Sequence, residues 1–156
     1  MKKILFVCLG NICRSPMAEG LMKKMIKDQE LEKWITVESR ATSSYEIGRP
    51  PHPKTMAILR REGAELTAKK AEQIKKEDFD SFDYIIGMDD QNVEVLKKMA
   101  NQHAHKVYLF RDIDPNTQGE QVPDPYYSGK YEETFGLIQQ SLIKWLEHLK
   151  KTEDCY

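Results

Sequence analysis

The chain of 156 residues is long enough for one compact domain or for two very small ones. Its 24 Lys and Arg against 25 Asp and Glu give a formal net charge of −1, which argues against a general nucleic-acid-binding protein. Hydrophobic residues make up 40% and charged residues 31%, a composition typical of a globular protein rather than of a disordered or membrane-embedded one. Because no Gly/Ser-rich linker or internal repeat divides the sequence, we expect residues 1–156 to form a single domain.

The first apolar run and the cysteines indicate the compartment. Residues 4–9 are too few to span a bilayer and lack the cleavage site of a secretory signal. Cys8, Cys13 and Cys155 are an odd number, so no disulfide framework is expected. Their spacing to the four histidines matches no zinc-ligand pattern. We therefore expect a cytoplasmic protein that contacts no membrane and needs no metal or cofactor.

The start of the chain predicts a strand, a turn and a helix. Residues 2–8 contain a continuous apolar run, which is typical of a strand buried on both faces. Ser15 is a favoured N-cap residue and Pro16 a favoured first helical residue, so a helix is expected to begin there. A second strand is expected at residues 35–41.

The middle of the chain predicts further alternation of helices and strands. In chain order we expect a rigid proline-rich loop at residues 48–53, a helix at 54–62 closed by Gly63, strands at 82–88 and 107–110 with a helix between them, and a long loop over 111–129. The lysines at 69, 70, 75 and 76 are expected on solvated helix faces.

The last helix has the clearest pattern. Its apolar residues recur at spacings of 4, 3, 4, 3 and 4 and form one stripe: Tyr131, Phe135, Ile138, Leu142, Trp145 and Leu149. The stripe covers fewer than three heptads, which favours packing within the domain over a coiled coil. Strands alternating with helices predict an α/β fold in which helices cover both faces of a mainly parallel sheet. In such sheets ligands bind beyond the carboxyl ends of the strands.

The loop after the first strand combines a cysteine with the parts of an anion site. Gly10 and Asn11 tolerate left-handed backbone angles, which lets successive N–H groups point inward at a helix N-terminus. Arg14 can bind two oxygens of a tetrahedral oxyanion. The N–H groups, the helix dipole and Arg14 favour the thiolate of Cys8, and the Ser15 hydroxyl can donate to the same sulfur. The pattern predicts a phosphate site with a nucleophile at its base; the alternative is that Cys8 is only a small buried side chain.

A second motif supplies a candidate acid. A thiolate that attacks a phosphoester expels an alkoxide or phenolate, so an acid is expected opposite the thiol. The best candidate is Asp124, because Pro123 and Pro125 fix its local backbone and forbid helix there. It would protonate the leaving oxygen and then take a proton from the water that hydrolyses the cysteinyl phosphate. The alternative is an ordinary turn aspartate.

The two motifs together resemble the low-molecular-weight protein tyrosine phosphatase family. The resemblance is carried by the stretch from Cys8 to Pro16 and by the late stretch from Asp124 to Tyr127, and it spans essentially the whole chain. It implies a single-domain, three-layer α/β/α fold of the Rossmann-like phosphotyrosine phosphatase I type, with a four-stranded parallel sheet. It also implies a metal-free mechanism in two steps through phosphocysteine.

The resemblance assigns a role to each site residue. Cys8 would be the nucleophile, Arg14 the phosphate clamp and Asp124 the acid and then the base. The phosphate-binding loop would comprise Leu9, Gly10, Asn11, Ile12, Cys13, Arg14 and Ser15, braced by Asn11, Ser15 and Ser39, while Tyr45, Tyr126 and Tyr127 would form the substrate rim. Many relatives carry His where this chain has Lys69, which puts the outer part of the bracing network in doubt.

The resemblance also implies the partners of the protein. Phosphotyrosine proteins would be substrates, and inorganic phosphate, vanadate or other oxyanions would be inhibitors. Nucleic acid and membranes would not be partners, and the chain would be a monomer or associate weakly with itself. Cys13 either only fills space or forms a protective disulfide with Cys8.

Three other functions share the same loop. A thiol-coupled arsenate reductase needs two further cysteines near the third strand, and residues 80–100 contain none. A protein arginine phosphatase has a threonine at the position of Ile12, and the apolar side chain here favours an aromatic phosphoester. A non-catalytic phosphate-binding or redox-sensing module using Cys8 and Cys13 would have no use for Asp124.

Overall fold

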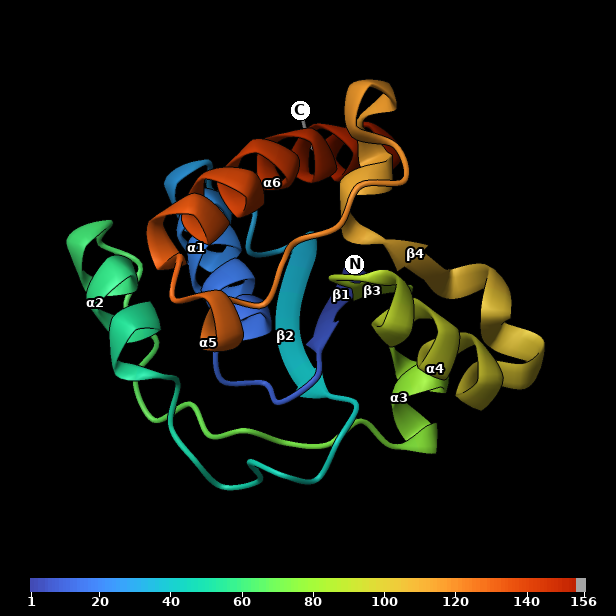
Figure 1. Cartoon of the computed structure of the whole chain (residues 1–156). Helices are drawn as coiled ribbons and strands as arrows, with labels where there is room; N and C mark the ends of the chain where they lie inside the picture. The colour runs from blue at the N-terminus through green and yellow to red at the C-terminus, as the bar shows by residue number, and fades with distance from the viewer. Residues whose placement is uncertain (154–156) are drawn as a thin grey trace.

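A four-stranded parallel sheet forms the centre of the protein (Figure 1). The computed structural model describes residues 1–153, so Cys155 lies outside the described residues. The strands are β1 (Lys2–Cys8), β2 (Ile35–Ala41), β3 (Tyr84–Gly87) and β4 (Val107–Leu109), in the order β2-β1-β3-β4. This is the fold that the alternation of strands and helices predicted. The first two strands have the predicted bounds, and the other two are shorter than predicted.

The helices cover both faces of the sheet, which gives three layers (Figure 1). Their bounds are α1 (Arg14–Asp28), α2 (Pro53–Arg61), α3 (Lys76–Ser81), α4 (Asp90–Ala100), α5 (Pro125–Ser128) and α6 (Tyr131–Glu153), with 3-10 turns η1 (Asn101–Lys106), η2 (Phe110–Ile113) and η3 (Pro115–Thr117). Helices α1 and α6 pack on one face with α2 outside α1, and α3 and α4 pack on the other.

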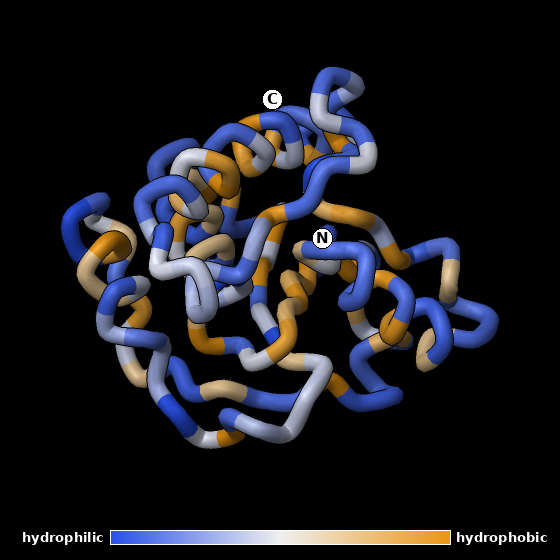
Figure 2. The backbone as a smooth tube through the Cα atoms, viewed as in Figure 1, coloured by the Kyte–Doolittle hydropathy of each residue, from blue (hydrophilic) through white to orange (hydrophobic). Residues whose placement is uncertain are grey.

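The apolar run of β1 explains why both faces are covered. Ile4 and Phe6 pack into the cluster beneath α1 and α6, while Leu5 and Val7 pack into the cluster beneath α3 and α4, and all four are fully buried. Successive strand side chains point to opposite faces, so a continuous apolar run needs a hydrophobic layer on each side. Figure 2 shows this hydrophobic centre and a largely hydrophilic periphery.

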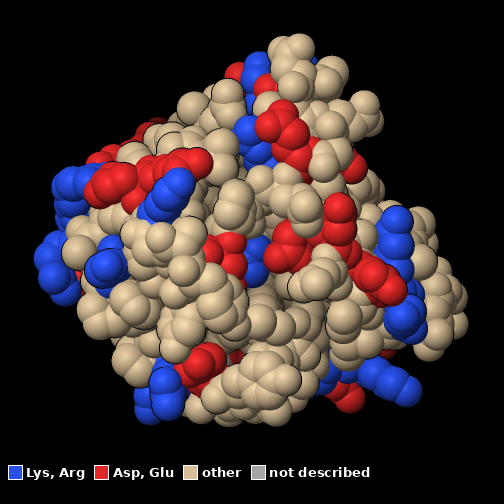
Figure 3. All heavy atoms as spheres, viewed as in Figure 1, with Lys and Arg blue, Asp and Glu red and all other residues tan. Residues whose placement is uncertain are grey.

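The stripe of α6 packs within the domain, as its spacing predicted. Ile138, Leu142 and Leu149 are fully buried, and Trp145 donates from Nε1 to the Phe110 carbonyl at 2.8 Å. The coiled-coil alternative is therefore wrong. Within residues 1–153, none of the helices is both long and apolar enough to cross a bilayer. On the face shown in Figure 3, acidic and basic side chains are interspersed.

The predicted start of α1 is wrong by two residues. The helix begins at Arg14 with Cys13 as its N-cap residue, and Ser15 is already inside it. The Ser15 side chain does not cap the helix, because it is engaged with Cys8 and Asn11 instead. The hydroxyl that was read as a helix-start signal is thus part of the site.

Three other regions contain helical turns that the sequence did not predict. The segment before β3 forms α3, and η1 lies between α4 and β4. The third region is the one interpreted as a long loop: η3 and α5 lie within it, and η2 begins one residue before it, at the end of the predicted fourth strand. Pro125 does not forbid a helix: it occupies the first turn of α5, where its missing N–H costs nothing. Lys69 and Lys70 lie in a loop rather than on a helix face, whereas Lys76 begins α3.

Candidate active site

The loop between β1 and α1 lies at the carboxyl edge of the sheet, next to the central strands (Figure 1). Asn11 has a φ of 58°, the left-handed conformation expected from the sequence, and its side chain is fully buried. Within residues 1–153, no acceptor takes a hydrogen bond from the backbone N–H groups of residues 9–13. The loop therefore offers a row of N–H donors immediately before the positive end of the α1 dipole.

Cys8 lies at the base of this loop with only 3% of its surface exposed. Its Sγ is 3.0 Å from Ser15 Oγ, which itself accepts a hydrogen bond from Asn11 Nδ2 at 2.8 Å. Since Asn11 donates to Ser15, the Ser15 hydroxyl proton is available for the sulfur or for the Arg40 carbonyl, which lies 3.5 Å from Ser15 Oγ. The Cys8 sulfur, at 3.0 Å, is the nearer of the two.

Arg14 is buried beside the thiol and is held by three acceptors. Its Nη1 donates to Asp89 Oδ2 at 2.7 Å and to the Val122 carbonyl at 2.8 Å, and its Nη2 is 3.4 Å from Asp124 Oδ2. Burial acts to lower the pKa of Arg14, but the Cys8 thiolate and the two carboxylates outweigh burial and raise it. Arg14 Nε has no acceptor within residues 1–153. The guanidinium thus keeps a fixed position, a permanent charge and a free donor.

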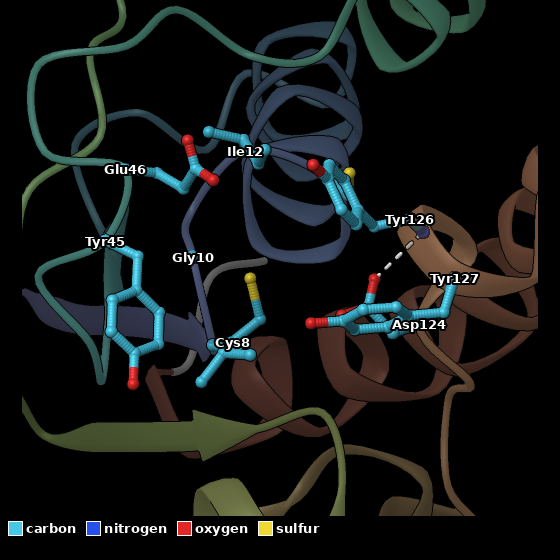
Figure 4. Close-up of a pocket in the computed structure, with 10 residues that line it drawn as sticks. Cys8, Gly10, Ile12, Tyr45, Glu46, Asp124, Tyr126 and Tyr127 are labelled. Carbon is cyan, nitrogen blue, oxygen red and sulfur yellow. Dashed lines mark hydrogen bonds between the residues drawn. The ribbon is translucent and has the colours of Figure 1, made fainter.

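Asp124 is positioned by its own backbone cap. Its Oδ1 accepts from the Tyr126 N–H at 3.1 Å as the N-cap of α5, and its side chain is 21% exposed (Figure 4). Two residues earlier, the N–H of Val122 donates to the Met88 carbonyl at 2.9 Å, and the Val122 carbonyl accepts from Arg14. These bonds fix the carboxylate next to the guanidinium at the mouth of the site.

The pocket above Cys8 has aromatic walls (Figure 4). It is lined by Cys8, Leu9, Gly10, Ile12, Cys13, Tyr45, Glu46, Asp124, Tyr126 and Tyr127. In the close-up the Cys8 sulfur points into the space between Tyr45 on one side and Asp124 and Tyr127 on the other. The three tyrosines are 52–78% exposed, so their rings lie at the entrance rather than in the core.

A buried hydrogen-bond network lies behind the loop. Asn11 Nδ2 donates to Ser39 Oγ at 2.9 Å as well as to Ser15, and Ser39 donates to Glu19 Oε1 at 2.5 Å. Lys69 extends this network: its Nζ donates to the Ser39 carbonyl at 3.0 Å and is 3.4 Å from Glu19 Oε1. The departure at position 69 therefore leaves the outer part of the network connected.

Cys13 occupies a different environment from Cys8, although both thiols are free and buried. Its Sγ is 3.4 Å from the Tyr131 hydroxyl, and the Tyr131 ring stacks on His52 with centroids 5.0 Å apart. Burial raises the pKa of Cys13 to about 12. Cys13 is therefore a neutral thiol near pH 7, unlike a nucleophile.

Three residues of the site were missed from the sequence. Asp89 follows β3 at the carboxyl edge of the sheet, so its position after a buried strand was the available signal. Glu19 shares a face of α1 with the buried residues Met22 and Ile26, and a carboxylate on that face was a detectable anomaly. Glu46 had no signal of its own, because its place in the pocket depends on the path of a loop. Within residues 1–153, no cluster of His, Cys, Asp and Glu could hold a metal ion.

The chain resembles known phosphatases in sequence and structure. Residues 3–154 match the sequence profile described as low molecular weight phosphotyrosine protein phosphatase. The low molecular weight protein-tyrosine-phosphatase YfkJ of Bacillus subtilis is 40% identical over 152 residues, 97% of each chain. Its crystal structure covers 98% of this chain and 97% of its own, with a TM-score of 0.94. A Streptococcus pyogenes low molecular weight protein tyrosine phosphatase is 45% identical over 96% and 93% of the two chains, with a TM-score of 0.84.

The same fold also serves another named activity. The crystal structure of a Drosophila arginine phosphatase is 31% identical to this chain over 96% and 98% of the two chains, with a TM-score of 0.87. The fold alone therefore does not separate these two substrate classes, and the higher identities lie with the tyrosine phosphatases. The family profile covers nearly all residues, and the loop, guanidinium and carboxylate converge on one thiol. The chain belongs to the low molecular weight phosphotyrosine protein phosphatase family.

Proposed function

We propose that the protein hydrolyses phosphotyrosine in proteins, and small aryl phosphates, through a phosphocysteine intermediate. The observation that carries this proposal is the donor set above Cys8: a row of unpartnered N–H groups from residues 9–13 and the free Nε of Arg14. Such donors bind a dianionic phosphoryl group and stabilise the charge that it carries in the transition state.

In the first step Cys8 Sγ attacks phosphorus. An S–P bond forms, the bond from phosphorus to the tyrosine oxygen breaks, and its electron pair stays on that oxygen. Arg14 and the loop N–H groups hold the equatorial phosphoryl oxygens. Asp124, protonated at the start of this step, gives its proton to the departing phenolate.

In the second step water replaces the thiolate. Asp124, now a carboxylate, accepts a proton from the water as its oxygen bonds to phosphorus. The S–P bond breaks, Cys8 recovers its electron pair as a thiolate that accepts from Ser15, and inorganic phosphate leaves. Because the same donors bind product and substrate, phosphate and vanadate would inhibit competitively.

The walls of the pocket support an aryl substrate. Tyr45 and Tyr127 flank the entrance, so a phosphotyrosine ring can stack between them while its phosphate reaches Cys8 (Figure 4). A phosphoserine side chain is shorter and has no ring for these walls. Ile12 adds an apolar side chain to the lining, which favours an aromatic phosphoester over phosphoarginine.

Further proposals concern the domain organisation, the compartment, self-association and Cys13. Residues 1–156 act as one domain, because the clusters on both faces share strand β1. The protein works in the cytoplasm, as monomers or weak self-associates. Cys13 acts as the redox partner of Cys8: a peroxide oxidises the Cys8 thiolate to a sulfenic acid, and the Cys13 sulfur then displaces the hydroxyl group as water to form a protective disulfide. Cys8 ends β1 and Cys13 immediately precedes α1, so the two thiols are separated only by a short loop. Because burial raises the pKa of Cys13, its thiolate fraction is small near pH 7 and this second step is slow there.

The variant Cys8→Ser tests the proposed function. It should lose all measurable turnover of p-nitrophenyl phosphate and of phosphotyrosine peptides, while inorganic phosphate still binds in calorimetry because the loop donors remain. Circular dichroism checks the fold. Residual turnover of the purified variant would contradict a phosphocysteine intermediate. Equal turnover of phosphotyrosine, phosphoarginine and phosphoserine peptides by the unmodified protein would contradict the proposed specificity.

A further inference from the structure

We propose that a groove between the phosphate-binding loop and α4 is a substrate subsite, which binds a basic side chain close to the phosphotyrosine of a polypeptide substrate. Its lining includes Leu9 of the loop, Thr42 after β2, and Glu94, Val95 and Lys98 of α4. Glu94 is its specificity-determining residue. The inference rests on the proposed function, because it concerns which phosphotyrosine polypeptides the same active site prefers.

The groove is continuous with the pocket above Cys8. Leu9, Asp124 and Tyr127 line both cavities. The pocket has a volume of about 60 Å³ and the groove one of about 460 Å³. The pocket therefore takes the phosphorylated side chain, and the polypeptide beside that side chain lies outside the pocket.

The groove leaves the pocket on one side. Asp124 and Tyr127, which it shares with the pocket, lie across the pocket from Tyr45 (Figure 4). The two directions of a polypeptide leave a phosphotyrosine on opposite sides, so one flank of the substrate enters the groove. An extended chain rises by about 3.3 Å per residue, so the first few residues of that flank reach α4.

Glu94 is the carboxylate of the groove that a substrate can reach. The other carboxylate on this side, Asp89, is engaged: its Oδ2 accepts from Arg14 at 2.7 Å and its Oδ1 from the Asn92 N–H at 2.8 Å. Glu94 lies 3.3 Å from Lys98, and the two side chains are 68% and 77% exposed. An ion pair this exposed contributes little, so a substrate cation can displace Lys98 from Glu94.

Val95 gives the groove an apolar wall beside this carboxylate. It follows Glu94 directly in α4, and its side chain is 41% exposed. Lysine and arginine cover apolar surface with their methylene stems while the charged end stays in water. A long basic side chain can therefore contact Val95 and Glu94 together. Arginine is favoured over lysine, because a guanidinium binds a carboxylate through two parallel N–H groups.

The charges of the groove disfavour an acidic substrate side chain. Among the described residues that line it, Lys98 is the one exposed cation, since the Arg14 side chain is 2% exposed and bound to Asp89. The positive end of the α4 dipole offers no further attraction, because Asp89 caps the helix and Asp90 lies in its first turn. An acidic side chain would instead approach the carboxylates of Asp89 and Glu94.

Matched phosphotyrosine peptides test the subsite. One series carries two arginines, two alanines or two glutamates directly after the phosphotyrosine, and a second series carries them directly before it. We expect one series to discriminate, with kcat/KM on the order of 5-fold higher for the arginine peptide than for the alanine peptide, and lower for the glutamate peptide. The preference should shrink between about 0.02 M and about 0.5 M NaCl, because salt screens an exposed ion pair.

The variant Glu94→Lys locates the preference. It should abolish the preference for arginine and favour the glutamate peptide, while Glu94→Gln should reduce the discrimination between the peptides. The matched control is Glu32→Lys, which makes the same change in net charge at an exposed residue between α1 and β2 and should keep the preference for arginine. Each rate is divided by the turnover of p-nitrophenyl phosphate, which has no flanking residues, so that differences in the amount of active protein cancel.

The outcomes distinguish the subsite from the proposed function. Equal kcat/KM for the arginine, alanine and glutamate peptides would overturn the subsite, and so would a preference for glutamate in the unmodified protein. A preference for arginine of equal size in both series, or one that Glu32→Lys lowers as much as Glu94→Lys does, would assign it to the overall charge of the protein and overturn the subsite as well. Absence of turnover of p-nitrophenyl phosphate and of every peptide by the unmodified protein would instead contradict the proposed function.

Discussion

Asp124 and Asp114 have the same local backbone setting. Each precedes a proline and caps a short helical turn, at the start of α5 and of η3 respectively, but only Asp124 lies at the pocket. Asparagine keeps the capping oxygen and removes the acid. The two positions therefore allow the chemistry of Asp124 to be separated from its structural role.

We predict that Asp124→Asn selectively slows substrates with poor leaving groups. Phenyl phosphate should lose on the order of 10²–10⁴-fold in kcat/KM, the usual contribution of a general acid, while an activated dinitrophenyl ester should lose much less. The matched variant Asp114→Asn should change neither. Steady-state kinetics over a series of substituted phenyl phosphates measures the effect. Equal losses across the series would remove Asp124 from the role of acid.

Cys13 is predicted to be unreactive near neutral pH. Its pKa is raised to about 12, first by burial, so the thiolate is a very small fraction at pH 7 and grows about tenfold per pH unit up to that pKa. In the Cys8→Ser variant, iodoacetamide should therefore modify Cys13 very slowly at pH 7 and markedly faster at pH 9, as followed by peptide mass spectrometry. Modification at pH 7 as rapid as that of an exposed thiol would contradict this environment.

At the residue scale the sequence predicted which residues meet at the site better than it predicted the contacts behind them. Cys8, Arg14 and Asp124 were predicted to lie together because each belongs to a local motif, and the structure brings them together; their catalytic roles stay predictions. The contact between Glu19 and Lys69 could not be predicted, because these residues lie fifty positions apart in the chain. From the sequence, Lys69 was interpreted both as a solvated lysine and as the residue that stands where many relatives carry His, and neither interpretation names Glu19 as its neighbour.

Helix α1 owes its close approach to α2 to one glycine. A Cβ at Gly20 would lie 2.8 Å from the Ala64 carbonyl oxygen and 2.8 Å from Leu59 Cδ2. Gly136 in α6 provides the comparison, since a Cβ there meets no atom within 4 Å among the described residues. The same substitution thus probes helix propensity at one position, and propensity together with packing at the other.

We predict opposite effects on stability at these two glycines. Gly136→Ala should stabilise the protein by up to about 1 kcal/mol, the difference in helix propensity between Gly and Ala. Gly20→Ala gains the same propensity but incurs overpacking of about 1–3 kcal/mol against a backbone atom that cannot rotate away, so it should be destabilising. Urea unfolding at constant m-value measures both. A Gly20→Ala protein as stable as Gly136→Ala would refute the close contact.

Elements whose sequences have a strong apolar periodicity were predicted, whereas elements that form through packing and capping contacts were not. Strands β1 and β2 and helix α6 have long apolar patterns, and the structure confirms them. Helix α3 has six residues of which five are charged or hydroxylic, so it has too little apolar pattern to be recognised. It forms because Phe79 packs into the cluster beneath it and because Asp78 accepts from the Lys75 N–H at 3.0 Å.

At the scale of the whole molecule, every group of the proposed mechanism is a side chain or a backbone amide. We therefore predict that dialysis against EDTA leaves kcat/KM for p-nitrophenyl phosphate unchanged within twofold, and that added Mg²⁺ or Zn²⁺ brings no activation. Activity measured before and after dialysis, with metal content determined by atomic emission, checks this. A loss that a stoichiometric metal restores would contradict the proposed mechanism.

The topology explains how distant segments meet at one thiol. The parallel order β2-β1-β3-β4 brings the carboxyl ends of β1, β2 and β3 to one edge. The loop after β1 and the segment carrying Tyr45 therefore line one pocket, and the turn after β3 reaches the same site through the hydrogen bond between Asp89 and Arg14. This convergence was predicted from the alternation of elements, whereas the partners of each side chain depended on loop paths that no local pattern encodes.

Val122 connects the end of the central sheet to the candidate acid and to the guanidinium. Val122 lies two residues before Asp124; its N–H donates to the carbonyl of Met88, directly after the central strand β3, and its carbonyl accepts from the Arg14 guanidinium. Asp124, the proposed proton donor, and Arg14, the proposed phosphate clamp, are therefore connected through the same backbone segment. In the proposed mechanism the acid and the guanidinium therefore have their relative positions before the substrate arrives, and substrate binding does not have to align them.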